Sequence, residues 1–171
     1  MLALAASCGA AFPALADGPD CRDADFRWSR TEPAINMRHV LCGEIKGNGD
    51  VVGLHARAIA GTAPVKAIRP EGGAPDGTYG ARVEFSNGKT KFSTFYPDHC
   101  TAADIEKSIL HAVRNSFGAA RPWGRLGCAA PDGTTPGYCR GPQGQRLVIR
   151  FGELKDGRIN TAFPLTGETC P

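Results

Sequence analysis

The clearest pattern in the chain is an alternation of apolar and polar residues over residues 78–86 and again over residues 89–96. Asn87-Gly88 lies between the two runs, and this pair favours the tight type I′ turn of a β-hairpin. The pattern therefore predicts two antiparallel strands that are joined by a two-residue turn.

A two-residue turn also determines which side chains share a face of this hairpin. Val83 is then expected opposite Phe92, on the apolar face. Lys91 and Ser93 are expected to point together from the other face, because alternate residues of a strand lie on the same side.

A helical pattern follows the hairpin. Thr101 and Asp104 fit a capping box, so a helix is predicted to begin there and to run to about Phe117, with Gly118 as its stop. Its buried stripe is expected to consist of Ile105, Ile109, Ala112, Val113 and Phe117.

The remaining elements are less regular. Residues 50–59 alternate as a strand does, whereas residues 35–45 fit a helix or a strand. A second hairpin is predicted over residues 145–163, with Pro164 as its end. Residues 60–77 and 118–144 are expected to be long loops.

These elements favour an α+β fold in which antiparallel sheets, made from hairpins, pack against one main helix. A chain of 171 residues suggests one domain, which we assign to residues 35–171 with a lead-in at 17–34. The net charge of +3 permits a polyanionic partner without requiring one.

Residues 1–16 carry no charged side chain and end in Ala-Leu-Ala, before a polar run. This resembles the apolar and cleavage regions of a secretory signal peptide, although the usual positive segment is missing. We therefore expect a secreted or periplasmic protein. Two alternatives are a lipoprotein signal ending at Cys8 and a buried N-terminal helix; the segment is too short to span a membrane.

Without residues 1–16 the chain has six cysteines, and an even number in an exported protein predicts three disulfides. The pairing stays open, but Cys170 is expected to hold the C-terminal tail. Cys128 and Cys139 bracket a loop that they could close on themselves. Cys42 is assigned to a disulfide rather than to a nucleophile, and the absence of CxxC spacing argues against a structural metal. The six are Cys21, Cys42, Cys100, Cys128, Cys139 and Cys170.

Candidate chemistry centres on His39 and His55, which flank a glycine-rich turn at residues 46–50. If both arms are strands, a turn centred on Gly47 sets the two histidines opposite each other; a helical first arm can also bring them together. Two imidazoles can act as general acid and general base near neutral pH. The turn lacks the lysine pattern of a phosphate-binding P-loop, so we interpret it as a simple turn.

A histidine pair with a lysine nearby suits RNA cleavage by attack of the 2′-hydroxyl. One histidine removes the 2′-proton, the other protonates the leaving 5′-oxygen, and Lys91 stabilises the developing charge. Lys89 is the alternative cation. The nucleophile belongs to the substrate, so no metal ion is expected to be needed.

Several motifs, taken in order, resemble those of EndoU-type endoribonucleases, and together they span about residues 35–165. They are Ile35-Asn36-x-x-His39-Val40-x-x-Gly43-Glu44, Gly53-Leu54-His55, Gly77-x-Tyr79-x-Ala81-x-Val83, Lys91-x-Ser93-Thr94-Phe95-Tyr96-Pro97 and Thr161-Ala162-Phe163-Pro164.

The resemblance implies an EndoU-like fold and cleavage 3′ of uridylates that leaves 2′,3′-cyclic phosphate ends. It also implies roles by position in the motifs. His55 would be the general base, His39 the general acid and Lys91 the group that stabilises the transition state.

The same resemblance implies residues that recognise the base. Ser93 would hold it, with Thr94 as the alternative, and Thr161 would assist from the C-terminal strand. Phe163 stands where the family usually has a tyrosine, so the chain keeps a stacking face there but loses a hydroxyl.

RNA is thus the expected partner, with no cofactor and at most stimulation by Mn²⁺. Many bacterial relatives are toxins, which implies an immunity protein as a further partner. We expect a monomer without membrane association. Two alternatives stay open: a non-enzymatic secreted binding module on the same scaffold, which the missing tyrosine favours, and a cysteine- or histidine-dependent hydrolase of another class.

Overall fold

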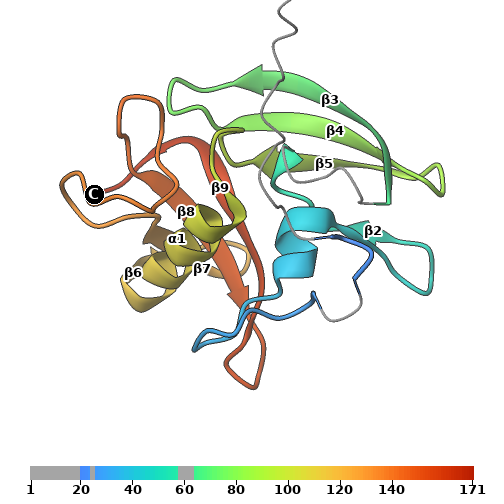
Figure 1. The fold of residues 1–171 in the computed structure, drawn as a ribbon, viewed down its shortest axis with the longest axis horizontal. Helices are drawn as coiled ribbons and strands as arrows, with labels where there is room; N and C mark the ends of the chain where they lie inside the picture. The colour runs from blue at the N-terminus through green and yellow to red at the C-terminus, as the bar shows by residue number, and fades with distance from the viewer. Residues whose placement is uncertain (1–19, 24–25, 58–63) are drawn as a thin grey trace, which may run out of the picture.

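Three antiparallel sheets and one main α-helix make up the part of the chain that the computed structural model describes, residues 20–23, 26–57 and 64–171 (Figure 1). The expected signal peptide lies outside these residues. The α+β fold class expected from the sequence is confirmed. In chain order the elements are η1 (Arg38–Cys42), β1 (Glu44–Ile45), β2 (Val51–Val52), β3 (Val65–Gly73), β4 (Tyr79–Phe85), β5 (Thr90–Phe95), α1 (Ala102–Arg114), β6 (Ser116–Ala119), β7 (Arg125–Cys128), β8 (Leu147–Glu153) and β9 (Ile159–Thr169).

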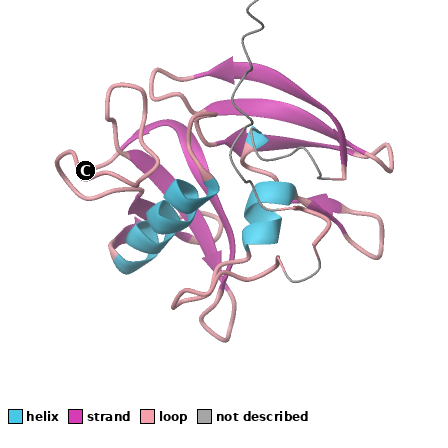
Figure 2. Ribbon diagram, viewed as in Figure 1, coloured by secondary structure: helices cyan, strands magenta, loops and turns pink. Residues whose placement is uncertain are grey.

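The elements form two halves that meet at strands β5 and β9. In the N-terminal half, sheet β3-β4-β5 lies beside the π-helical turn η1 and the short pair β1-β2 (Figure 1). In the C-terminal half, helix α1 packs against sheet β6-β7-β8-β9 (Figure 2). Contacts between β5 and β9 join the halves, so residues far apart in sequence become neighbours there.

The described residues contain two apolar clusters, and the larger one extends from the C-terminal half to the buried residues of η1. Ile105 and Ile109 of α1 are fully buried in one cluster with Ile149 and Phe151 of β8. A second cluster lies beneath sheet β3-β4-β5 and encloses the fully buried side chain of Leu54. Burial of apolar surface in these clusters is the main stabilising contribution to the fold.

Helix α1 begins as predicted but ends early. The Thr101–Asp104 capping box is present, with the Asp104 backbone N–H donating to Thr101 Oγ1. Asn115 ends the helix by donating to the carbonyl of His111 through both its backbone and its side chain. Phe117 therefore lies in β6 and is exposed, so its assignment to the buried stripe and that of Gly118 to the stop are wrong.

Both predicted long loops contain strands. Residues 60–77 include β3, an edge strand, which tolerates Pro70 because one side of an edge needs no ladder hydrogen bonds. Residues 118–144 include β7. The strand β9 also continues through Pro164, which sits at a register shift between β8 and β9.

The register of the β4–β5 hairpin is shifted by one residue from the prediction. Phe85 and Lys89 close the turn with a backbone hydrogen bond, so it holds three residues rather than two. Val83 consequently pairs with Lys91, and Phe92 points to the exposed face. Lys91 and Ser93 do share a face, but it is the inner one.

The six cysteines form three disulfides, as expected for a protein that folds in an oxidising compartment: Cys21–Cys42, Cys100–Cys139 and Cys128–Cys170. Cys170 does hold the C-terminal tail, whereas the predicted pairing of Cys128 with Cys139 is wrong. Ser108, in the middle of α1, accepts a hydrogen bond from the backbone of Cys139 and holds it against the helix. Among the described helices, none is long and apolar enough to cross a membrane.

The Cys21–Cys42 disulfide anchors the end of η1, so its removal should loosen that turn. We expect the double variant C21S/C42S to lose about 3 kcal/mol of unfolding free energy in urea denaturation, because the loop it closes becomes unrestrained. Amide exchange at residues 38–42 should rise as well. The matched control C128S/C170S should lose comparable stability but leave exchange in η1 unchanged; equal exchange in both variants would contradict this role.

Candidate active site

The turn that carries His39 is built around the side chain of Asn36. The backbone N–H of His39 donates to Asn36 Oδ1 at 3.1 Å. Asn36 Nδ2 in turn donates to Asn160 Oδ1 of β9 at 3.2 Å. The position of His39 is therefore tied to the strand that also carries Thr161 and Phe163.

Backbone hydrogen bonds then join His39 to the segment of His55. The N–H of Leu54 donates to the His39 carbonyl at 2.9 Å, and that of His55 to the Val40 carbonyl at 2.7 Å. Gly53 permits this approach, because a Cβ there would lie 2.0 Å from the His39 carbonyl oxygen. The two imidazole centroids lie 6.5 Å apart as a result.

Leu54 stores backbone strain beside this contact. Its φ of 66° lies in the left-handed region that a side chain of this size rarely adopts. Its fully buried side chain in the core under sheet β3-β4-β5 holds it there. Strain of this kind is concentrated at functional sites, where the surrounding structure over-determines one geometry.

His55 has a defined proton arrangement. Its Nδ1 lies 2.8 Å from the carbonyl oxygen of Thr94, and a carbonyl can only accept, so Nδ1 carries the hydrogen. In the neutral ring, Nε2 then has a free lone pair and can take a proton. The ring is buried and stacks on Phe163 at a centroid distance of 5.1 Å.

Lys91 approaches the histidines from β5. Its Nζ donates to the Gly53 carbonyl at 2.6 Å and to Ser93 Oγ at 3.2 Å, which leaves one of its three N–H groups for a ligand. Ser93 Oγ is buried and donates to the Leu54 carbonyl at 2.7 Å. Thr94 Oγ1 is also buried but has no hydrogen-bond partner among the described residues.

The electrostatics of the site favour an anion. Burial, together with the charges of Lys91 and Lys46, lowers the pKa of His39 to about 4. Burial and Lys91 also lower the pKa of His55 well below its usual value, and burial lowers the pKa of Lys91 to about 8. A negative charge placed between these groups would act against these shifts, because it favours the protonated form of each group.

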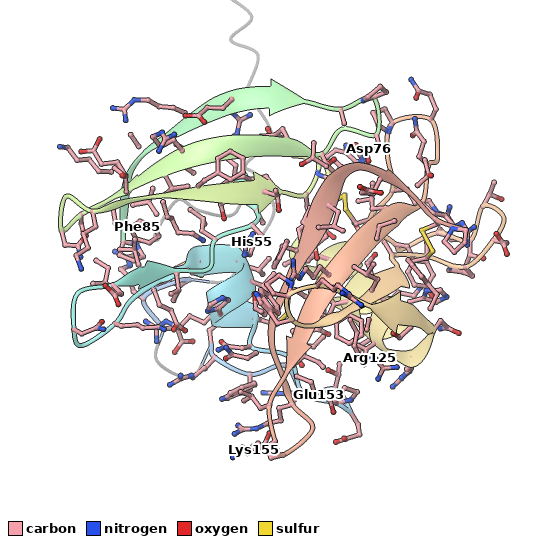
Figure 3. All side chains as sticks on the ribbon, turned by 180° about the vertical axis from the view of Figure 1, so that it is seen from behind. His55, Asp76, Phe85, Arg125, Glu153 and Lys155 are labelled. Carbon is pink, nitrogen blue, oxygen red and sulfur yellow. A yellow bond between two sulfur atoms is a disulfide. The ribbon has the colours of Figure 1, made fainter. Side chains whose placement is uncertain are left out.

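The residues assigned to the site from sequence, together with the alternative Thr94, line one cavity of about 350 Å³. The alternative cation Lys89 is not among the described residues of the lining and pairs with Asp50 instead. No carboxylate is among the described residues of its lining, which are His39, Val51, Val52, Gly53, His55, Lys91, Phe92, Ser93, Thr94, Trp123, Thr161 and Phe163. His55 lies at the junction of the two halves, between sheet β3-β4-β5 and strands β8 and β9 (Figure 3).

Sequence reasoning missed two large side chains of this cavity. Phe92 was expected on the apolar inner face because of the register error, and it is instead 53% exposed. Trp123 falls in the stretch read as a loop, and no motif marks it. Its contact with the site arises only from the way the β6–β7 turn folds over β8 and β9.

A larger cavity of about 540 Å³ lies elsewhere, and Arg22, Arg27, Arg38 and Glu44 are among its lining. We do not place the site there, because the paired imidazoles and Lys91 converge on the smaller cavity. Within residues 20–23, 26–57 and 64–171, no group of three or more His, Cys, Asp or Glu side chains could hold a metal ion.

The geometry thus defines a class of protein: an α+β protein with a paired-histidine site suited to a phosphate group. A comparison with family models matches residues 34–166 to the bacterial EndoU nuclease family. The match covers most of the chain, so the chain belongs to this family of nucleases, and the resemblance seen in the motifs is confirmed. No curated protein and no solved structure matches the chain.

The low pKa of His39 predicts acid sensitivity. Between pH 6.5 and about 4 the unfolded chain binds more protons at this position than the folded chain, so stability is lost as the pH falls through this range. When the pH is lowered from 7.5 to 5, the unfolding free energy measured by urea denaturation should fall in the wild type by about 2 kcal/mol more than in H39Q. H99Q, at an exposed histidine bonded to the Arg140 carbonyl, serves as the control. Parallel losses in wild type and H39Q would contradict the prediction.

Proposed function

We propose that the protein is an exported, metal-independent endoribonuclease that cleaves RNA 3′ of uridylates and leaves 2′,3′-cyclic phosphate ends. The observation that carries this proposal is the free Nε2 of His55, set beside His39 and Lys91 in a cavity without described carboxylates. Membership of the EndoU nuclease family supports it.

In the proposed reaction the nucleophile is the 2′-hydroxyl of the substrate. His55 Nε2 takes the proton of this hydroxyl, and the 2′-oxygen forms a bond to phosphorus. His39 gives a proton to the 5′-oxygen as the P–O5′ bond breaks. The remaining N–H of Lys91 donates to a non-bridging oxygen and stabilises the added charge.

Substrate binding prepares the general acid. In the free protein His39 is mostly neutral at pH 7, because its pKa is about 4. The charge of a bound phosphate favours the protonated ring and raises this pKa. The protonated fraction of His39 is therefore higher when a phosphate occupies the site, which favours proton transfer in the bound state.

Recognition of the base falls to β5 and β9. Thr94, whose Oγ1 has no partner among the described residues, and Thr161 line the cavity, and Phe163 presents an aromatic ring. Ser93 Oγ already donates to the Leu54 carbonyl and accepts from Lys91 Nζ, so it can contact a base only as an acceptor. The preference for uridine is therefore assigned to Thr94 and Thr161, with Ser93 as a residue that positions Lys91 and accepts from the base.

Export and a toxin role complete the proposal. Three disulfides suit a compartment outside the cytoplasm, as does the apolar segment at residues 1–16. The producing cell would then need an immunity protein. A monomer with no required cofactor is expected, and acidic side chains of the immunity protein would complement the cationic cavity.

Removal of either imidazole should abolish cleavage. Oxidised protein lacking residues 1–16 is incubated with a uridine-containing RNA in EDTA, and the ends are analysed for cyclic phosphate. H39A and H55A should each lose about 10²–10⁴-fold in rate, since each removes one proton-transfer group. H99A, outside the cavity, should retain wild-type activity.

Two results would count against the nuclease. One is the absence of cleavage by the wild type, with or without Mn²⁺, which would favour a binding module on this scaffold. The other is cleavage that survives both substitutions, which would place the chemistry on other residues.

The pH dependence of kcat/KM provides a separate prediction. The base must be neutral and the acid protonated, and both histidines have a lowered pKa in the free protein, so the optimum of kcat/KM should lie below pH 6.5. The optimum of kcat should lie higher, because bound phosphate raises the pKa of His39. K91M should shift the basic limb of the kcat/KM profile to higher pH, because Lys91 lowers the pKa of His39. K89M changes an exposed lysine that pairs with Asp50 and should leave the profile unchanged. A flat profile from pH 5 to 9 would argue against paired-histidine chemistry.

A further inference from the structure

Trp123 is an exposed aromatic residue that is nevertheless held in place. It lies in the turn between β6 and β7 and is 46% exposed. The Arg150 guanidinium lies 4.0 Å from its ring centroid, and Arg150 also donates a hydrogen bond to the Trp123 carbonyl. A ring fixed in this way would lose little side-chain freedom when it binds a ligand.

The ring rests on the outer face of the β8–β9 pair. Arg150 pairs with Phe163 and Gly152 with Thr161, so these four residues share one face. Gly152 leaves room for the indole, because a Cβ there would lie 3.2 Å from Trp123 Cζ3. Trp123 therefore lies directly beside Thr161 and Phe163, at the edge of the catalytic cavity.

Phe163 and Trp123 differ in what their rings already contact. Phe163 stacks on His55, and its centroid lies 6.0 Å from that of Trp123, in an edge-on arrangement. The indole is half exposed and lines the cavity. Phe163 lies between His55 and Trp123. The Trp123 ring therefore offers an aromatic surface to solvent next to Phe163.

We propose that Trp123 is a stacking platform for an unpaired base of the RNA, on a nucleotide that neighbours the one carrying the attacking 2′-hydroxyl. The inference rests on the proposed function. His55 must touch the 2′-hydroxyl, so the base of that nucleotide falls near Phe163 and Thr161, and the next base reaches Trp123. Aromatic rings stack on any base, and Arg150 places a positive charge beside the same site.

This platform gives the nuclease a preference for single-stranded RNA of more than one nucleotide around the cleavage position. In a duplex both faces of a base are already covered by its neighbours. A base can stack on Trp123 only where the RNA strand is unpaired.

The competing explanation is that Trp123 merely covers Gly152, as aromatic side chains do on other sheets.

A binding experiment tests the contact without cleavage. The chain has two tryptophans, and Trp28 lies beneath Arg158 and is not among the described residues lining the cavity. In W28F, Trp123 is the only tryptophan, and its emission is followed with excitation that does not excite tyrosine. The probe is a single-stranded oligoribonucleotide with one 2′-deoxyuridine in place of its only uridine, which removes the nucleophile. Quenching of Trp123 on titration supports stacking. Saturable binding of the probe, measured by anisotropy, without quenching would overturn it.

A cleavage experiment assigns the contact to a neighbouring base. On an intact oligoribonucleotide W123A should lose about 10-fold in kcat/KM, and W123F should lose less because it keeps a ring. Two further substrates carry an abasic residue, one on the 5′ side and the other on the 3′ side of the uridine. The substrate that lacks the base stacking on Trp123 should be cleaved equally by wild type and W123A. F117A, at an exposed aromatic of β6 that is not among the described residues lining the cavity, is the matched control and should behave as wild type.

The outcomes separate this inference from the proposed function. If the wild type cleaves but W123A cleaves equally well, or loses the same factor on both abasic substrates, the platform is overturned while the nuclease stands. If the wild type does not cleave at all, the proposed function fails, and the fluorescence titration still decides whether RNA stacks on Trp123. A melting temperature of W123F equal to that of the wild type would show that its cleavage data reflect contact rather than unfolding.

Discussion

The site depends on the two backbone hydrogen bonds that join residues 39–40 to residues 54–55. They are short enough to exclude any side chain at Gly53, and they force Leu54 into a conformation that only its deep burial sustains. Because the main chain holds the two histidines together, neither ring has to bond to the other. His55 Nε2 therefore bonds to none of the described residues, and the carbonyl of Gly53 remains available to hold Lys91.

This arrangement has an electrostatic cost that the free protein reduces by keeping its imidazoles uncharged. Three groups that can carry positive charge converge where burial disfavours it, and the described residues around them include no acid. Such a site is less stable than an apolar core of the same size. In the proposed reaction, a bound phosphate would supply the missing negative charge and would stabilise the protonated forms of these groups.

Local patterns in the sequence predicted much of the fold and most of the site. The alternation around Asn87-Gly88, the capping box at Thr101 and the motifs around His39 and His55 are short-range signals. The structure has the hairpin, the helix start and the histidine pair that they marked. The strand expected over residues 50–59 was wrong beyond its first residues, because the described part contains only β2 at Val51–Val52. Long-range features were not predictable in this way. The strand β3 is supported by its pairing with β4 rather than by its own residues, and the partner of Cys139 is set by contact with helix α1. Trp123 reaches the cavity by packing over Gly152 of β8, for which a single sequence contains no periodic signal.

The meeting of the two halves at β5 and β9 has a consequence for how such a protein can evolve. In the proposed reaction the groups that transfer protons all come from residues before α1, and the rings and hydroxyl of β9 and the β6–β7 turn come after it. Mutations in the later segment can therefore change which RNA is chosen while proton transfer is preserved. Phe163 is the exception, because its ring packs on His55. A substitution of Phe163 that changes the base preference would also change the basicity of His55. A substitution of Trp123 would leave the basicity of His55 unchanged.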